Sequence, residues 1–232
     1  MRFTSFIKGM MVIERPLGFI SNYLELLNNQ LKQTIPGYVL SKRQQLWLGF
    51  CLSAIVITNT ICWKRFERAS LGSFKDSALS WMFRYSKIGF MILFQTSILQ
   101  VLRSYGITEG VLCIDDVDRR RSKSTKCLYR VHKLKDKLTG GYCEGQSLVF
   151  LFLVTPRVSF PVGFEFYCPD PQWQAWQKEE DRLRALKTPK EQRPAKPERD
   201  SNFPTKIQIA LTLLKNFRQH FGSLTLRAVV AD

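Results

Sequence analysis

Apolar positions recur every three or four residues through most of residues 1–106, and this is the spacing of amphipathic helices. Four helices are predicted on this basis, over 16–31, 41–67, 74–85 and 86–104. Ser41 and Gln44 have the spacing of a capping box, which marks the start of the second helix. Gly106 ends the last one. We therefore predict a helical bundle over 1–106.

After Gly110 the pattern changes to short apolar runs that are typical of strands. These runs cover 111–114, 147–155, 158–167 and 223–232. Pro161 predicts that the third is an edge or bulged strand. Pro204 predicts the start of a helix between the third and fourth. The order strand, strand, strand, helix, strand is that of the first half of an RNase H-like α/β domain. The sequence thus predicts an α+β protein.

Between the third strand and this helix, composition shifts to charged residues and proline. A short helix is predicted over 172–186, followed by a flexible loop. We therefore predict two domains. A helical domain spans 1–106, and the RNase H-like part spans 107–232 and includes a charged loop over 169–203.

Charge is the unusual feature of the composition. The chain has 232 residues, with 35 Lys and Arg against 19 Asp and Glu, a net charge of +16. Such an excess predicts a polyanionic partner, with nucleic acid first and an anionic membrane surface second. The uncharged stretch 44–63 is diluted by polar residues, so a buried helix is the preferred interpretation over a membrane span. No secretory signal is present, so we expect a cytoplasmic protein with six reduced cysteines.

Acidic residues follow two of the predicted strands. Asp115 and Asp116 come directly after the run 111–114, and Asp232 follows the last strand. If the two strands are neighbours in one sheet, these carboxylates converge, and converging carboxylates bind Mg²⁺ or Mn²⁺. An Asp at a strand end is also a common turn former. The pattern therefore leaves both a metal site and a turn open.

A basic stretch follows the first acidic pair and is predicted to contact DNA phosphates. Its bases are Arg119, Arg120, Arg121, Lys123, Lys126, Arg130, Lys133, Lys135 and Lys137. Lys206, near the start of the predicted helix, is a further candidate phosphate contact. A solvated surface is the alternative interpretation for these residues.

Four stretches together resemble the DDE transposases of bacterial insertion sequences, nearest the insertion-sequence-four type. They are Gly110–Asp118, the run beginning Gly145-Gln-Ser-Leu, Phe203–Leu211 and Leu226–Asp232. The resemblance implies that Asp116 and Asp232 are catalytic and hold Mg²⁺ or Mn²⁺. Val117 stands where the family commonly has Thr, so Asp115 stays an alternative to Asp116. The family's third acid, a glutamate on a later helix, has no counterpart before Asp232.

The resemblance implies that the helical domain over 1–106 is a DNA-binding domain. It implies a transposase that binds double-stranded DNA, at transposon ends and at a target, and performs metal-dependent hydrolysis and strand transfer. A homodimer is left open, and no membrane partner is expected. Because one acid is missing, we expect a chain truncated at the second aspartate that is weakly active or inactive by itself. Two alternatives remain. One is a non-catalytic DNA-binding protein such as a transposition inhibitor, and the other is a basic protein anchored to a membrane by 44–63.

Overall fold

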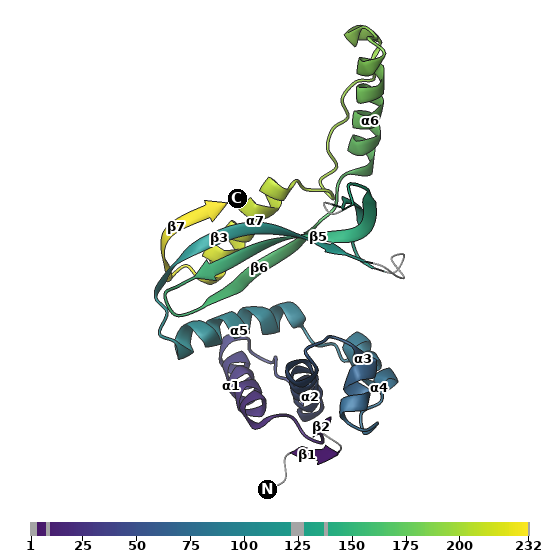
Figure 1. Ribbon diagram of the computed structural model, residues 1–232. Helices are drawn as coiled ribbons and strands as arrows, with labels where there is room; N and C mark the ends of the chain where they lie inside the picture. Colours follow the sequence, from purple (N-terminus) through teal and green to yellow (C-terminus); the bar gives the residue numbers. More distant parts are fainter. Residues whose placement is uncertain (1–3, 8–9, 122–127, 137–138, 232) are drawn as a thin grey trace. The chain divides into compact units, whose positions relative to one another are not determined.

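The computed structural model describes residues 4–7, 10–121, 128–136 and 139–231 (Figure 1). The chain is α+β and divides into two compact units, Met1–Tyr105 and Gly106–Asp232. Each unit is described by itself below.

The first unit is mainly helical, but it opens with a hairpin that the sequence analysis did not predict. Strands β1 (Thr4–Ile7) and β2 (Met10–Ile13) pair antiparallel. The helices that follow are α1 (Gly18–Thr34), α2 (Lys42–Thr58), α3 (Trp63–Ala69), α4 (Asp76–Tyr85) and α5 (Phe90–Ser104).

The prediction of one helix over 41–67 is wrong, because the chain breaks into α2 and α3 at a bend of 89°. The capping box at Ser41 and Gln44 is present and starts α2 as predicted. Asn59 ends α2 in the left-handed conformation with φ 49°, which a short polar side chain tolerates. The bend brings the Trp63 ring to 6.2 Å from that of Trp47.

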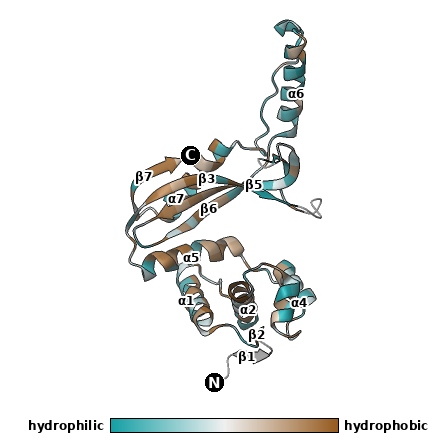
Figure 2. Ribbon diagram, viewed as in Figure 1, coloured by the Kyte–Doolittle hydropathy of each residue, from teal (hydrophilic) through white to brown (hydrophobic). Residues whose placement is uncertain are grey.

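Aromatic and aliphatic side chains form the core of this unit. Phe50 is fully buried and stacks on Phe74 with ring centroids 4.0 Å apart. The buried Ser53 hydroxyl accepts a hydrogen bond from the Leu17 backbone and donates one to the Gly49 carbonyl, which joins the start of α1 to α2. Figure 2 shows the apolar character of α2. The uncharged stretch therefore contributes side chains to this core.

None of the described helices is by itself long and apolar enough to cross a membrane. By length and composition only, two bent helix pairs could cross a membrane. They are α2 with α3, bent by 89°, and α4 with α5, bent by 88°.

The second unit contains a mixed five-stranded sheet. Its strands are β3 (Glu109–Arg120), β4 (His132–Lys135), β5 (Tyr142–Val154), β6 (Ser159–Tyr167) and β7 (Thr225–Ala231). The strand order is β4-β5-β3-β7, and β6 also pairs with β5. β5 is antiparallel to its three partners, whereas β7 is parallel to β3. The predicted strands are present, and β4 is an addition that the sequence analysis missed.

Helix α7 (Lys206–His220) packs on one face of this sheet. Its apolar residues Ile209, Leu213 and Phe217 are buried. A Cβ on Gly163 of β6 would lie 3.2 Å from Leu213 Cδ2, so the helix approaches the sheet closely at this glycine. Thr205 caps α7, so Pro204 lies before the cap and the prediction that it begins the helix is wrong by two residues.

The charged segment 169–203 contains helix α6 (Pro171–Ala185), a 3₁₀ turn at Lys190–Gln192 and an extended return, and it projects away from the sheet (Figure 1). The Asp170 carboxylate accepts from the backbone N–H groups of Gln172, Trp173 and Asp200. Its burial acts to raise its pKa, but these hydrogen bonds prevail and hold the pKa below its usual value. Arg193 pairs with Glu180 at 2.9 Å and ties the return to the helix. The return is thus structured, and we call the whole segment 169–203 the arm.

Cys51 and Cys62 are predicted to differ in reactivity. Burial raises the pKa of the Cys51 thiol from 9.0 to about 12, so the thiol stays protonated at pH 8, whereas Cys62 is exposed. Because the thiolate is the nucleophile, we expect iodoacetamide at pH 8 to label Cys62 in the folded protein and Cys51 only after denaturation. Peptide mass spectrometry measures both. Equal labelling rates in the folded protein would contradict the buried position of Cys51.

Candidate functional site

The acidic pair lies inside β3, so the prediction that it follows the end of a strand is wrong. β3 continues to Arg120 because each residue from Asp115 to Arg120 pairs with a residue of β5. These pairs give the charged part of the strand backbone partners that do not depend on its side chains. Both aspartates are therefore held on a central strand.

The two aspartates point to opposite faces, because side chains alternate along a strand. Asp116 pairs with Val149 and lies on the face of Leu112 and Leu151, which α7 covers. Asp115 pairs with Phe150 on the other face, where its carboxylate accepts from the next backbone N–H at 2.7 Å.

Lys206, the first residue of α7, forms an ion pair with Asp116. Its Nζ donates to Asp116 Oδ2 and lies 5.4 Å from the centre of the Tyr167 ring. Both side chains are more than one third exposed, so solvent screens the pair and it contributes at most about 1 kcal/mol to stability. The described structure thus has a cation beside the carboxylate that the sequence analysis favoured.

Next to this pair, three side chains form a network that the sequence analysis did not single out. The Ser147 hydroxyl donates to Asp118 Oδ1 and lies 3.2 Å from His132 Nε2. His132 Nδ1 lies 3.1 Å from the Arg130 carbonyl, which can only accept, so Nδ1 carries a proton. Asp118 shares the face of Asp116 by alternation. Strand alternation is the one sequence signal that could have placed Asp118 on the face of Asp116. The contacts of Ser147 and His132 with each other and with Asp118 depend on strand pairing, which the sequence does not show.

The strand that leads to Asp232 lies directly beside β3. β7 runs parallel to β3, with Ile114 opposite Ala231. Asp232 itself lies outside the described residues. The condition stated for converging carboxylates, that their two strands are neighbours, is met.

No three His, Cys, Asp or Glu side chains within the described ranges gather closely enough to hold a metal ion. Asp116 and Asp118 lie on one face of β3, and hard cations prefer carboxylate donors of this kind. A metal site at these two carboxylates would need at least one further ligand.

The predicted basic stretch is divided between strands and between faces. Arg119 and Arg120 end β3, where Arg120 lies 3.5 Å from Asp136. Lys133 and Lys135 lie on the exposed side of β4, because Leu134 between them is buried. The bases at positions Lys123, Lys126 and Lys137 lie outside the described residues.

The other two described bases of the stretch are held by neighbours. Arg121 donates to Gln146 Oε1 at 2.9 Å. Arg130 lies over the Tyr129 and Phe203 rings, at 5.3 and 5.1 Å, and donates to the Asn202 carbonyl at 2.8 Å. Arg130 thus joins the segment before β4 to the segment before α7.

Comparison with protein-family models, with curated proteins and with solved structures found no match to this chain. Its function is therefore argued from its residues and their geometry.

Replacing Ser147 with Ala is predicted to destabilise the second unit. Ser147 is only 2% exposed, and its loss leaves Asp118 and His132 without their shared partner. We expect a loss of about 1–2 kcal/mol in the free energy of unfolding, measured by urea denaturation. Ser159→Ala, at an exposed position of β6, is the control and should change little. Equal stability of the two variants would contradict the network.

Proposed function

We propose that this chain binds DNA, and that Gly106–Asp232 is the first part of an RNase H-like domain of the DDE transposase type. Asp116 and Asp232 are the acids of its metal centre in this proposal. The observation that carries it is the parallel pairing of β3 with β7, which places the strand that leads to Asp232 beside the strand that holds Asp115 and Asp116.

The strand arrangement supports the RNase H-like part of the proposal. β3, β5 and β6 form an antiparallel set, and α7 then leads to β7, which returns parallel to β3. This is the order strand, strand, strand, helix, strand that the sequence predicts, with β4 and α6 added. The first acid stands on β3, which lies between β5 and β7 in the sheet.

The contact with Lys206 favours Asp116 over Asp115, which stays the alternative ligand. Asp116 faces α7 and already attracts a cation, the ammonium of Lys206. When bound, Mg²⁺ or Mn²⁺ would activate water or a 3′-hydroxyl for attack on a phosphodiester. Asp116 and Asp232 would hold the ion, and Lys206 would be free to approach a DNA phosphate once displaced.

A non-catalytic DNA-binding protein is the second candidate. The observation in its favour is that Asp116 is ion-paired with Lys206 and that no three ligands gather within the described residues. Such a protein keeps the charge-driven affinity for DNA but has no use for a divalent ion.

The test is a titration of the full chain with Mn²⁺, in which the electron paramagnetic resonance signal of free Mn²⁺ measures how much ion is bound. We expect Asp116→Asn to weaken binding about tenfold or more, which is about 1.4 kcal/mol. Asp115→Asn removes the same charge from the neighbouring position on the other face, and it should bind Mn²⁺ like the unchanged chain.

Two results would decide against the metal centre. They are equal Mn²⁺ affinity of Asp116→Asn and the unchanged chain, or equal weakening by both Asn variants. Duplex binding that persists in either case would favour the non-catalytic candidate.

A further inference from the structure

The first unit has one helix whose exposed side carries aromatic and basic side chains together. Ser77, Ala78, Trp81, Arg84 and Tyr85 of α4 are exposed and recur at the spacing of a single helix face. Trp81 is 54% exposed and Tyr85 59%, although large aromatic rings are usually buried. We call these five residues the α4 face, and its exposed aromatic rings indicate a surface that binds a partner.

The opposite side of α4 is fixed to the core, so the exposed face is presented rigidly. Leu79 is 2% exposed, and its carbonyl accepts a hydrogen bond from Trp47 Nε1 at 3.2 Å. The Phe83 ring is 50% exposed and lies 5.9 Å from that of Trp63 on α3. On the exposed side, the Arg84 guanidinium is held by the Ser80 hydroxyl at 3.0 Å and lies 6.0 Å from the Tyr85 ring centre.

A structured turn joins α3 to α4. Leu71 and Gly72 both have positive φ, 50° and 80°. The buried Ser70 hydroxyl donates to the Glu67 carbonyl and accepts from the Phe74 backbone N–H, which fixes the turn at both ends. Two short helices joined by a fixed turn and packed on a third resemble a helix-turn-helix, here with a longer connection over residues 70–75.

The charges around α4 complement a polyanion. The acids nearby are already neutralised: Glu67 by Lys64 and Lys75, and Asp76 by Lys64. Arg65 and Arg68 on α3 are exposed, and within the described residues neither has an acidic partner.

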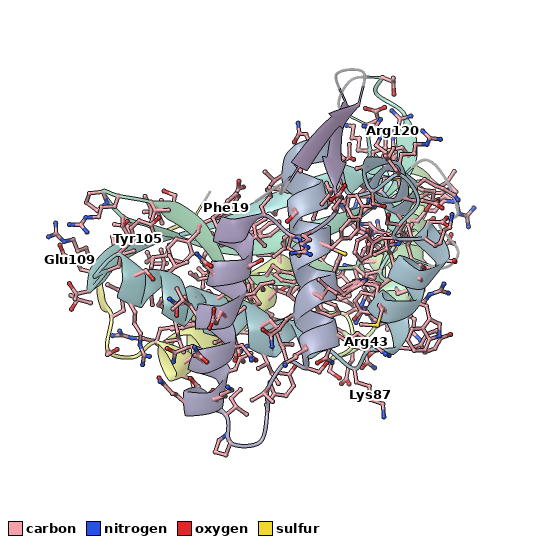
Figure 3. The ribbon with its side chains drawn as sticks, turned by 90° about the horizontal axis from the view of Figure 1, so that it is seen from below. Phe19, Arg43, Lys87, Tyr105, Glu109 and Arg120 are labelled. Atoms are coloured by element: carbon pink, nitrogen blue, oxygen red, sulfur yellow. The ribbon has the colours of Figure 1, made fainter. Side chains whose placement is uncertain are left out.

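Further bases stand where α4 ends. Gln44 Nε2 donates to the Ser86 carbonyl at 2.8 Å, which joins the start of α2 to the end of α4. Arg43 and Lys87, the neighbours of these two residues, lie toward the same edge of the first unit in Figure 3. Exposed bases are thus present on α3 and also near the end of α4.

We propose that α3 and α4 form a DNA-binding helix-turn-helix in which α4 enters the major groove. In this arrangement, Arg65 and Arg68 of α3 contact phosphates. Ser77 and Ala78 are small enough for the start of α4 to approach base edges, and Arg84 and Trp81 contact bases further along the groove. This inference rests on the DNA-binding part of the proposed function and assigns it to particular residues, independently of the metal centre.

The test uses the full chain and a fluorescent 30-base-pair duplex of random sequence. The fluorescence anisotropy of the duplex measures binding. We expect the pair Trp81→Ala with Arg84→Ala to weaken binding about tenfold or more. We expect Arg65→Ala with Arg68→Ala to weaken binding and to flatten its dependence on salt. Lys32→Ala, which removes an exposed base from α1, is the matched control and should bind like the unchanged chain.

The base-reading role of α4 has its own measurement. Selection from the random pool should yield a preferred sequence with the unchanged chain and none with the α4 variant. Circular dichroism should show that the variants keep the helical content of the unchanged chain, because the substituted side chains are exposed.

Three results would overturn the inference. The first is that the α4 variant binds the duplex as tightly as the Lys32→Ala variant. The second is that the unchanged chain binds no duplex. The third is that the α4 variant loses binding to phosphatidylcholine–phosphatidylserine vesicles but not to the duplex. The last would assign the face to a membrane surface. The α4 variant should bind Mn²⁺ like the unchanged chain, so failure of the metal centre is visible separately, in the Mn²⁺ titration.

Discussion

The second unit depends on the pairing of β3 on both of its edges. β5 runs antiparallel along one edge, and β7 runs parallel along the other. A parallel neighbour cannot be reached by a tight turn, so the chain must cross over before it returns. The crossover contains the arm and α7, and it brings Lys206 to the face of β3 that carries Asp116. The register of β3 therefore decides which aspartate meets the helix.

Local patterns were sufficient for most of the elements. The three- and four-residue spacing located α1, α4 and α5, and apolar runs located β5, β6 and β7. Pro161 correctly indicated an irregular edge strand, because the register between β5 and β6 shifts beside it. The break between α2 and α3 was missed because Asn59, rather than Gly or Pro, takes the left-handed conformation there.

Features that depend on distant residues could not be predicted in the same way. The charged end of β3 has no apolar pattern, and it is a strand only because β5 pairs with it. In β4, Leu134 alone is buried, which is too little for a strand signal. Asp116 and Lys206 were both singled out from the sequence, but 90 residues separate them, so their ion pair follows only from the fold. The network of Asp118, Ser147 and His132 is of the same kind.

The basic character of the chain is distributed differently in the two units. In the first, the acids near α4 are paired with lysines, which leaves the arginines of α3 available. In the second, bases lie on both faces of the sheet, and Lys206 is held by Asp116. This distribution favours DNA recognition in the first unit and phosphate chemistry in the second.

The adjacency of β3 and β7 is tested most directly by a disulfide across them. Cys113 lies opposite Val230, so Val230→Cys places two thiols at paired positions of neighbouring strands. After mild oxidation, peptide mass spectrometry should find residue 113 linked to residue 230. Val229→Cys, whose partner is Leu112 on the other face, should give no such link. Absence of the link in the Val230 variant, or equal linking in both, would contradict the parallel pairing on which the proposed site rests.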